Sequence, residues 1–106
     1  MRHGWLTTLR RDGSARTTRV RFVEESGSIW IATSTPARKV ADLGQDPRVT
    51  FAIEGRDGSV RGTAEVVPIE EHPEIVRAFA EQYDGWDAAD PGSWGPRVLI
   101  RIAPGA

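Results

Sequence analysis

The sequence predicts a mainly β protein, in which a six-stranded antiparallel barrel carries two short helices. Short runs with alternating apolar residues recur along most of the chain, as they do in half-buried strands. Tight-turn signals, Asp12-Gly13 and Asp57-Gly58 among them, separate neighbouring runs and favour hairpins. Apolar residues recur at helical spacing in two segments. Hairpin-joined strands with few helices are typical of an antiparallel barrel with helices beside it.

Six alternating runs are predicted as strands. In the second run, Val20 and Phe22 alternate with Arg19 and Arg21, so the two arginines share one face. Gly62, inside the fifth run, suggests a bulge, a bend or the close approach of another group. The predicted strands are Trp5–Leu9, Thr17–Val23, Ile29–Thr33, Val49–Ile53, Val60–Val66 and Val98–Ile102.

Two segments are predicted as helices. The first runs from about Pro36 to Gly44, with Val40 and Leu43 as its apolar stripe. Thr35 is its predicted N-cap, and Pro36 suits the first helical position because its missing N–H would be unpaired there. The second helix begins near Pro73, and its apolar side consists of Ile75, Val76, Phe79 and Tyr83.

Length and composition bound the function classes. A chain of 106 residues forms one domain, residues 1–106, and its net charge of −1 gives no field that would recruit nucleic acid. No apolar run reaches the ~20 residues of a membrane span, and the N-terminus has no apolar signal core, so we expect a cytoplasmic protein. The chain has no cysteine, and its two histidines, His3 and His72, lie far apart. We therefore expect neither a metal site nor a catalytic triad.

The most informative segment is Thr33–Lys39, where a strand ends and a helix begins. It brings together three hydroxyls, of Thr33, Ser34 and Thr35, and two cations, Arg38 and Lys39. A helix N-terminus favours negative charge, and a phosphate is a natural occupant. An ordinary strand-to-helix junction with both cations in water fits this segment equally well.

The outward arginines of the second strand, Arg19 and Arg21, also have two interpretations. They face either solvent or a groove in which they hold an anion beside Arg38 and Lys39, and strand alternation does not decide between these.

Two tryptophans, Trp86 and Trp94, lie in the irregular segment 84–96. They plug an end of the barrel, pack on a second subunit or stack on a planar ligand. The carboxylates stand in turn or helix-start contexts, so no acid–base pair and no catalytic residue is predicted. If the protein is an enzyme, its chemistry belongs to a cofactor.

Several stretches together resemble the flavin-binding split-barrel family, which includes the pyridoxamine-phosphate oxidases and the deazaflavin-dependent reductases of actinobacteria. The core of the resemblance is Ser28–Phe51, with Ala37-Arg38-Lys39, Asp42-Leu43 and Asp46-Pro47-Arg48-Val49 at the family's motif positions. Gly62–Glu65 resembles the family's Gly-x-Ala strand, and Leu6–Leu9 its opening hairpin. The resemblance implies a six-stranded antiparallel split β-barrel.

The resemblance also implies a cofactor, FMN or alternatively a deazaflavin (coenzyme F-420). Its phosphate would bind Arg38 and Lys39. The family is dimeric, which implies a homodimer with the cofactor groove at the subunit interface. The other implied cofactor-binding residues are Arg19, Val20 and Arg21 beside the ring, and Thr33, Ser34 and Thr35 near the phosphate.

The chain departs from the family pattern at three points. Ala37 replaces a usual serine, the N-terminal helix is absent, and the chain stops at Ala106, before the tail that grips pyridoxal phosphate. We therefore do not expect vitamin-oxidase activity. The leading hypothesis is an oxidoreductase that moves hydride between the cofactor and an unidentified small molecule. The alternatives are a non-catalytic flavin- or heme-binding module and a dimeric interaction protein with an empty groove.

Overall fold

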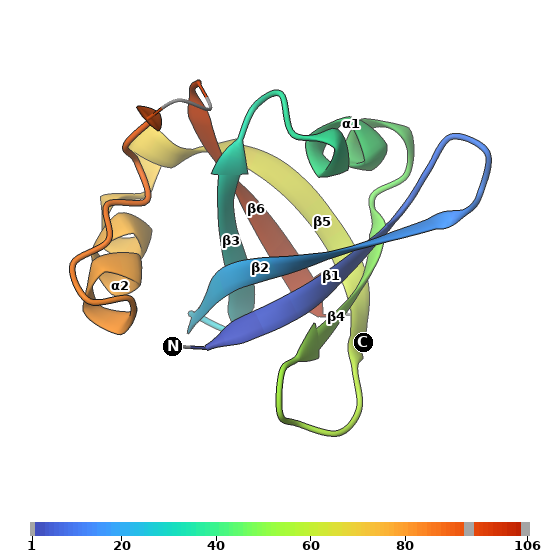
Figure 1. Ribbon diagram of the computed structural model, residues 1–106, viewed down its shortest axis with the longest axis horizontal. Coiled ribbons are helices and arrows are strands. Elements are labelled where there is room, and N and C mark those ends of the chain that lie inside the picture. Colours follow the sequence, from blue (N-terminus) through green and yellow to red (C-terminus); the bar gives the residue numbers. More distant parts are fainter. Residues whose placement is uncertain (1, 93–94, 105–106) are drawn as a thin grey trace.

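Six antiparallel strands close into a barrel in the order β1-β2-β3-β6-β5-β4, as predicted, with one helix near an end and another at its side (Figure 1). The computed structural model describes residues 2–92 and 95–104. The elements are β1 (His3–Leu9), β2 (Ala15–Glu25), β3 (Ser28–Ser34), α1 (Arg38–Gln45), β4 (Arg48–Ile53), β5 (Val60–Pro68), the 3-10 turn η1 (Ile69–Glu71), α2 (Pro73–Gln82) and β6 (Arg97–Pro104). None of the described helices is long and apolar enough to cross a membrane.

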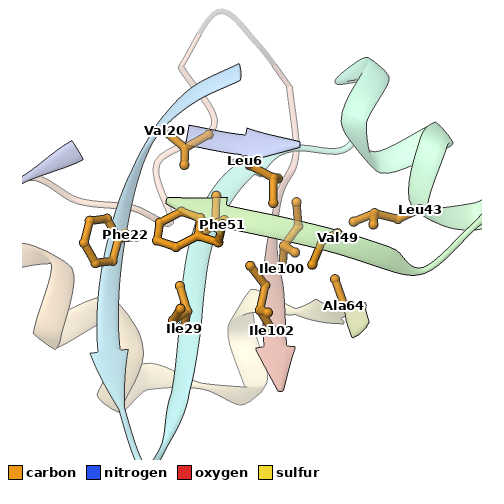
Figure 2. Close-up of a cluster of buried hydrophobic side chains, with 11 residues drawn as sticks. Leu6, Val20, Phe22, Ile29, Leu43, Val49, Phe51, Ala64, Ile100 and Ile102 are labelled. Atoms are coloured by element: carbon orange, nitrogen blue, oxygen red, sulfur yellow. The ribbon is translucent and has the colours of Figure 1, made fainter. Parts of the chain in front are cut away.

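Alternate residues of the strands fill the barrel interior, since successive side chains of a strand point to opposite faces (Figure 2). The rings of Phe22 and Phe51 meet edge to face, with centroids 5.0 Å apart. Gly4 is required beside them, because a Cβ there would lie 2.2 Å from Phe51 Cζ. In β5, Ala64 is buried, whereas Val60 and Val66, which alternation places on the same face, are exposed.

The second helix, α2, covers the outer face of the barrel beside β3 and β6. Phe79 of α2 joins Trp30 of β3 and Leu99 of β6 in a second buried cluster. The hydroxyl of Tyr83 accepts a hydrogen bond from the backbone N–H of Phe22, with an N···O distance of 2.8 Å. This buried hydroxyl thus ties the end of α2 to β2.

The first helix, α1, differs from its prediction in its start and in its buried face. It begins at Arg38, and its N-cap is Ala37, which makes no side-chain capping bond. The predicted N-cap, Thr35, is wrong because its N–H and its Oγ1 both donate to the carbonyl of Pro96, at 2.8 and 3.1 Å. Leu43 is buried as predicted, but its buried neighbour on the helix is Asp42, not Val40.

Both Asp-Gly segments lie in hairpin connections, as predicted. Asp12-Gly13 joins the antiparallel pair β1 and β2, and Asp57-Gly58 joins β4 and β5. Gly13 and Gly58 have φ angles of 87° and 86°, a region that glycine enters without a steric penalty.

Strands β2 and β3 pair over only part of their lengths. Their ladder joins Phe22–Glu25 to Ser28–Ile31. Beyond it, residues 15–21 of β2 pair with β1, and residues 32–34 of β3 pair with β6. The two strands diverge past this ladder (Figure 1), which is the split in the barrel. The diverging end of β3 leads directly to α1.

Candidate functional site

The predicted phosphate segment forms one wall of a surface hollow of about 550 Å³ at the end of β3. Four predicted site residues line it, two from the strand end and two from the first turn of α1. A third cation, Arg97, completes it, because β6 runs antiparallel to β3 and sets Arg97 opposite Ser34. The lining residues are Thr33, Ser34, Pro36, Ala37, Arg38, Lys39 and Arg97.

The strand and the helix position the polar groups of the hollow differently. Thr33 is buried and Ser34 half-buried at the end of β3. Arg38, the first residue of α1, is exposed, whereas the neighbouring Lys39 is half-buried. The first turn of α1 contains no acidic residue, so nothing in it offsets the positive end of the helix dipole.

The electrostatics of the hollow favour an anion. Partial burial lowers the pKa of Lys39, and the nearby charge of Arg97 lowers it further. Burial also lowers the pKa of Arg97, while Asp90 opposes this effect and Arg21 adds to it. No carboxylate is among the lining residues. An anion bound here would therefore stabilise cations that now repel one another.

Arg21 lies near this cluster of cations through its contact with Trp86. The guanidinium carbon of Arg21 is 4.6 Å from the centroid of the Trp86 ring, and that of Arg97 is 5.6 Å from the same centroid. Trp86 itself packs edge to face against Phe79 and Tyr83. Trp86 thus packs within the chain, on the cluster beneath α2 and outside the barrel interior, so it does not plug an end of the barrel. Its packing on a second subunit or stacking on a planar ligand stays a prediction. Trp94 lies outside the described residues.

The structure does not bring the remaining predicted residues into the hollow. Arg19 forms a two-pronged ion pair with Glu54, with N···O distances of 2.8 and 3.0 Å. The side chain of Val20 is buried in the barrel interior, so it has only its backbone to offer a ligand. Thr35 lines a neighbouring hollow together with Pro96 and Arg97.

Arg97 is the residue that sequence reasoning missed. It lies at the start of the last strand, 58 positions after Lys39 in the numbering of the chain. A closed barrel requires a second strand to pair with β3 on the side away from β2, but the sequence does not identify which strand this is. Among the described residues, no group of three or more His, Asp or Glu side chains is placed to hold a metal ion.

Comparisons with known proteins agree with this architecture. Residues 2–106 match the family described as Pyridoxamine 5'-phosphate oxidase. No curated protein matches the chain. Among solved structures, the conserved hypothetical protein Rv2991 from Mycobacterium tuberculosis is similar, with 29% identity, a TM-score of 0.81, and coverage of 100% of this chain and 74% of that one.

Two further solved structures share the fold. An F420 reductase is 24% identical with a TM-score of 0.78, over 98% of this chain and 86% of its own. HutZ, the heme storage protein from Vibrio cholerae, is 18% identical with a TM-score of 0.79, over 98% of this chain and 82% of its own.

Proposed function

Because the chain belongs to the pyridoxamine 5'-phosphate oxidase family, we propose that it binds a flavin or deazaflavin and holds the cofactor's phosphate in the hollow between β3 and α1. The observation that carries this proposal is the composition of the hollow. It presents Arg38, Lys39 and Arg97 together with the hydroxyls of Thr33 and Ser34, and no carboxylate lines it. Such a donor set fits a phosphate group.

Each part of the hollow has a distinct role in this proposal. Arg38 and Lys39 supply charge-assisted hydrogen bonds, and the start of α1 adds the positive end of its dipole. Ser34 and Thr33 supply hydroxyl donors in place of the hydroxyl that a serine at position 37 would offer and Ala37 lacks. The cofactor is FMN, or alternatively the deazaflavin coenzyme F-420.

The proposed activity is that of an oxidoreductase acting on an unidentified small molecule. The bound cofactor supplies the hydride chemistry, and the chain holds the phosphate, orients the ring and excludes water. No side chain is proposed as catalytic. The likeness to an F420 reductase supports this class of activity.

The second candidate is a non-catalytic module that carries flavin or heme. The likeness to HutZ favours it. For heme, the positions of the histidines argue against this candidate, because neither lines the hollow. The ring of His72 packs at a tilt against Trp30, with centroids 5.0 Å apart, and that of His3 lies edge to face with Tyr83, with centroids 6.4 Å apart. Flavin carriage without turnover is therefore the stronger form of this alternative.

The protein is further proposed to be a homodimer whose cofactor groove lies between subunits. Trp5 on β1 is 42% exposed, an unusual state for so large an apolar side chain. It pairs across the ladder with Arg19, one of the residues expected beside the ring. A second copy packed over this face would cover Trp5, and it would bring Arg19 close to the cofactor that the second copy binds.

Spectroscopy and titration test the proposed function. The purified protein is examined for a flavin spectrum or a Soret band, then titrated with FMN and with coenzyme F-420, following fluorescence. Binding of either with micromolar or tighter affinity is expected, and reduction of the bound cofactor by a candidate donor separates an enzyme from a carrier. A protein that binds neither cofactor contradicts the proposal.

A further inference from the structure

The hollow contains a half-buried arginine, Arg97, that has no ion-pair partner among the residues that the structure describes. Arg97 projects from the first position of β6 into the hollow that Arg38 and Lys39 also line. It is half-buried, and burial lowers the pKa of its guanidinium. The charge of Asp90 opposes this effect, and the charge of Arg21 adds to it.

The side chain of Arg97 is held by two contacts that leave its terminal nitrogens free of ion pairs. Its Nε donates to the carbonyl of Ala88 at 3.1 Å, and its guanidinium carbon lies 5.6 Å from the Trp86 ring centroid. Within residues 2–92 and 95–104, no carboxylate lies within ion-pair distance of Arg97. The planar guanidinium is thus positioned in advance, which reduces the entropy lost when it binds a ligand.

A second arginine on the same strand provides an internal comparison. Arg101 also lies over a tryptophan, with its guanidinium carbon 5.6 Å from the ring centroid of Trp30. Its Nη1, however, donates to Glu65 at 3.1 Å. The two arginines share a strand and a distance to a tryptophan ring, but in the described part of the chain only Arg101 has a carboxylate within ion-pair distance. The carboxylate of Asp90 acts on Arg97 from farther away.

The charge in the hollow sets the kind of anion that it suits. Three cations line it, and Arg21, which contacts the same Trp86 ring as Arg97, adds a fourth positive charge nearby. A phosphate monoester carries about −1.5 to −2 charges at pH 7, because its second pKa is near 6. A phosphodiester carries a single negative charge, so it offsets less of this positive potential.

We propose that Arg97 is a third phosphate-binding cation and that it makes the hollow selective for the dianion of a phosphate monoester, the form present in FMN. This inference rests on the proposed function, since it concerns the same hollow. It adds a residue from β6, fixed by Ala88 and Trp86, to the pair supplied by α1.

The test compares FMN with riboflavin, which has the same ring and no phosphate. Fluorescence titrations are run from pH 5 to pH 8 on the full chain and on the variants R97Q, R101Q and R38A. For the unaltered chain, the ratio of FMN to riboflavin affinity should rise severalfold as the phosphate loses its second proton, around pH 6. R97Q should lower FMN affinity about tenfold to a hundredfold, leave riboflavin affinity unchanged and flatten this rise.

The variants distinguish a failure of the role of Arg97 from a failure of the proposed phosphate site. R101Q, on the same strand, should leave both affinities unchanged. If R38A weakens FMN binding but R97Q alters neither affinity nor pH profile, the role of Arg97 is disproved and the proposed function stands. If neither variant affects FMN binding, the hollow is not the phosphate site. Thermal melting shows whether R97Q folds. If it does not, the unaltered chain still provides the test: a ratio of FMN to riboflavin affinity that does not change with pH overturns the dianion selectivity.

Discussion

Arg16 and Asp42 form a partly buried ion pair, with 2.8 Å between Nε and Oδ2, that fastens α1 to the β1–β2 hairpin. The same Oδ2 accepts a hydrogen bond from the hydroxyl of Thr8, also at 2.8 Å. Because α1 carries Arg38 and Lys39 on its first turn, this pair helps to set where the proposed phosphate-binding cations stand.

Replacing Asp42 by alanine should destabilise the protein. The change leaves the Arg16 guanidinium and the buried Thr8 hydroxyl without their acceptor, a loss of roughly 2–4 kcal/mol in the free energy of unfolding. Urea denaturation measures it. The control D57N alters an exposed turn aspartate and should change stability by less than about 0.5 kcal/mol. Equal midpoints for D42A and the unaltered chain would contradict the role of the pair.

Asp42 should also contribute to acid sensitivity. Burial alone would raise its pKa, but hydrogen bonds from Arg16 and Thr8 lower it below the ordinary value of 3.8. The unfolded chain then takes up the proton first, so stability from this group is present above about pH 4 and falls on further acidification. D42N removes the titrating group, and its urea midpoint should decline less than that of the unaltered chain between about pH 5 and pH 3.

Removing either proposed phosphate-binding residue of α1 should weaken the cofactor and spare the fold. R38A and K39A should each lower the affinity for FMN, or for coenzyme F-420, about tenfold to a hundredfold, since each removes charge-assisted hydrogen bonds. Arg38 is exposed and Lys39 half-buried, so circular dichroism should be unchanged. R56A, at an exposed residue between β4 and β5, serves as the control and should bind normally. Equal cofactor affinities for R38A, K39A and R56A would show that Thr33–Lys39 is an ordinary helix start and not a phosphate site.

The Asp-Gly turns should be scaffold and not binding loops. D12N and D57N should leave cofactor affinity unchanged, because Asn-Gly forms the same turns as Asp-Gly. Isothermal titration of both variants measures this directly. A tenfold loss in either would show that the turn takes part in the site.

The proposed homodimer can be examined through Trp5. Sedimentation at micromolar concentration should report twice the monomer mass, since stable interfaces of this kind bury on the order of 2,000 Å². W5E should shift the equilibrium toward monomer by placing a charge in the interface, whereas E65Q, a change of an exposed charge on β5, should not. A monomer for the unaltered chain rules out an intersubunit cofactor groove.

Most features that depend on neighbours a few residues apart could be predicted from the sequence alone. Alternation placed Val20 and Phe22 inward, and Asp-Gly pairs marked the hairpins. Thr33–Lys39 was identified as a strand-to-helix junction at which hydroxyls and cations gather. These features were predictable because strand alternation and turn geometry are local properties of the backbone.

Tertiary structure decided which distant groups meet and which local preferences are overridden. Arg97 joins Lys39 because β6 closes the barrel beside β3, and local pattern does not specify that pairing. Thr35 is not the helix cap, because α1 begins only at Arg38 and Thr35 instead donates to the carbonyl of Pro96. Arg19 and Arg21 share the outer face of β2, as alternation predicts, but Arg19 pairs with Glu54 whereas Arg21 contacts Trp86. In each case a partner remote in sequence offers a stronger interaction than the local pattern does, and only the folded chain brings that partner within reach.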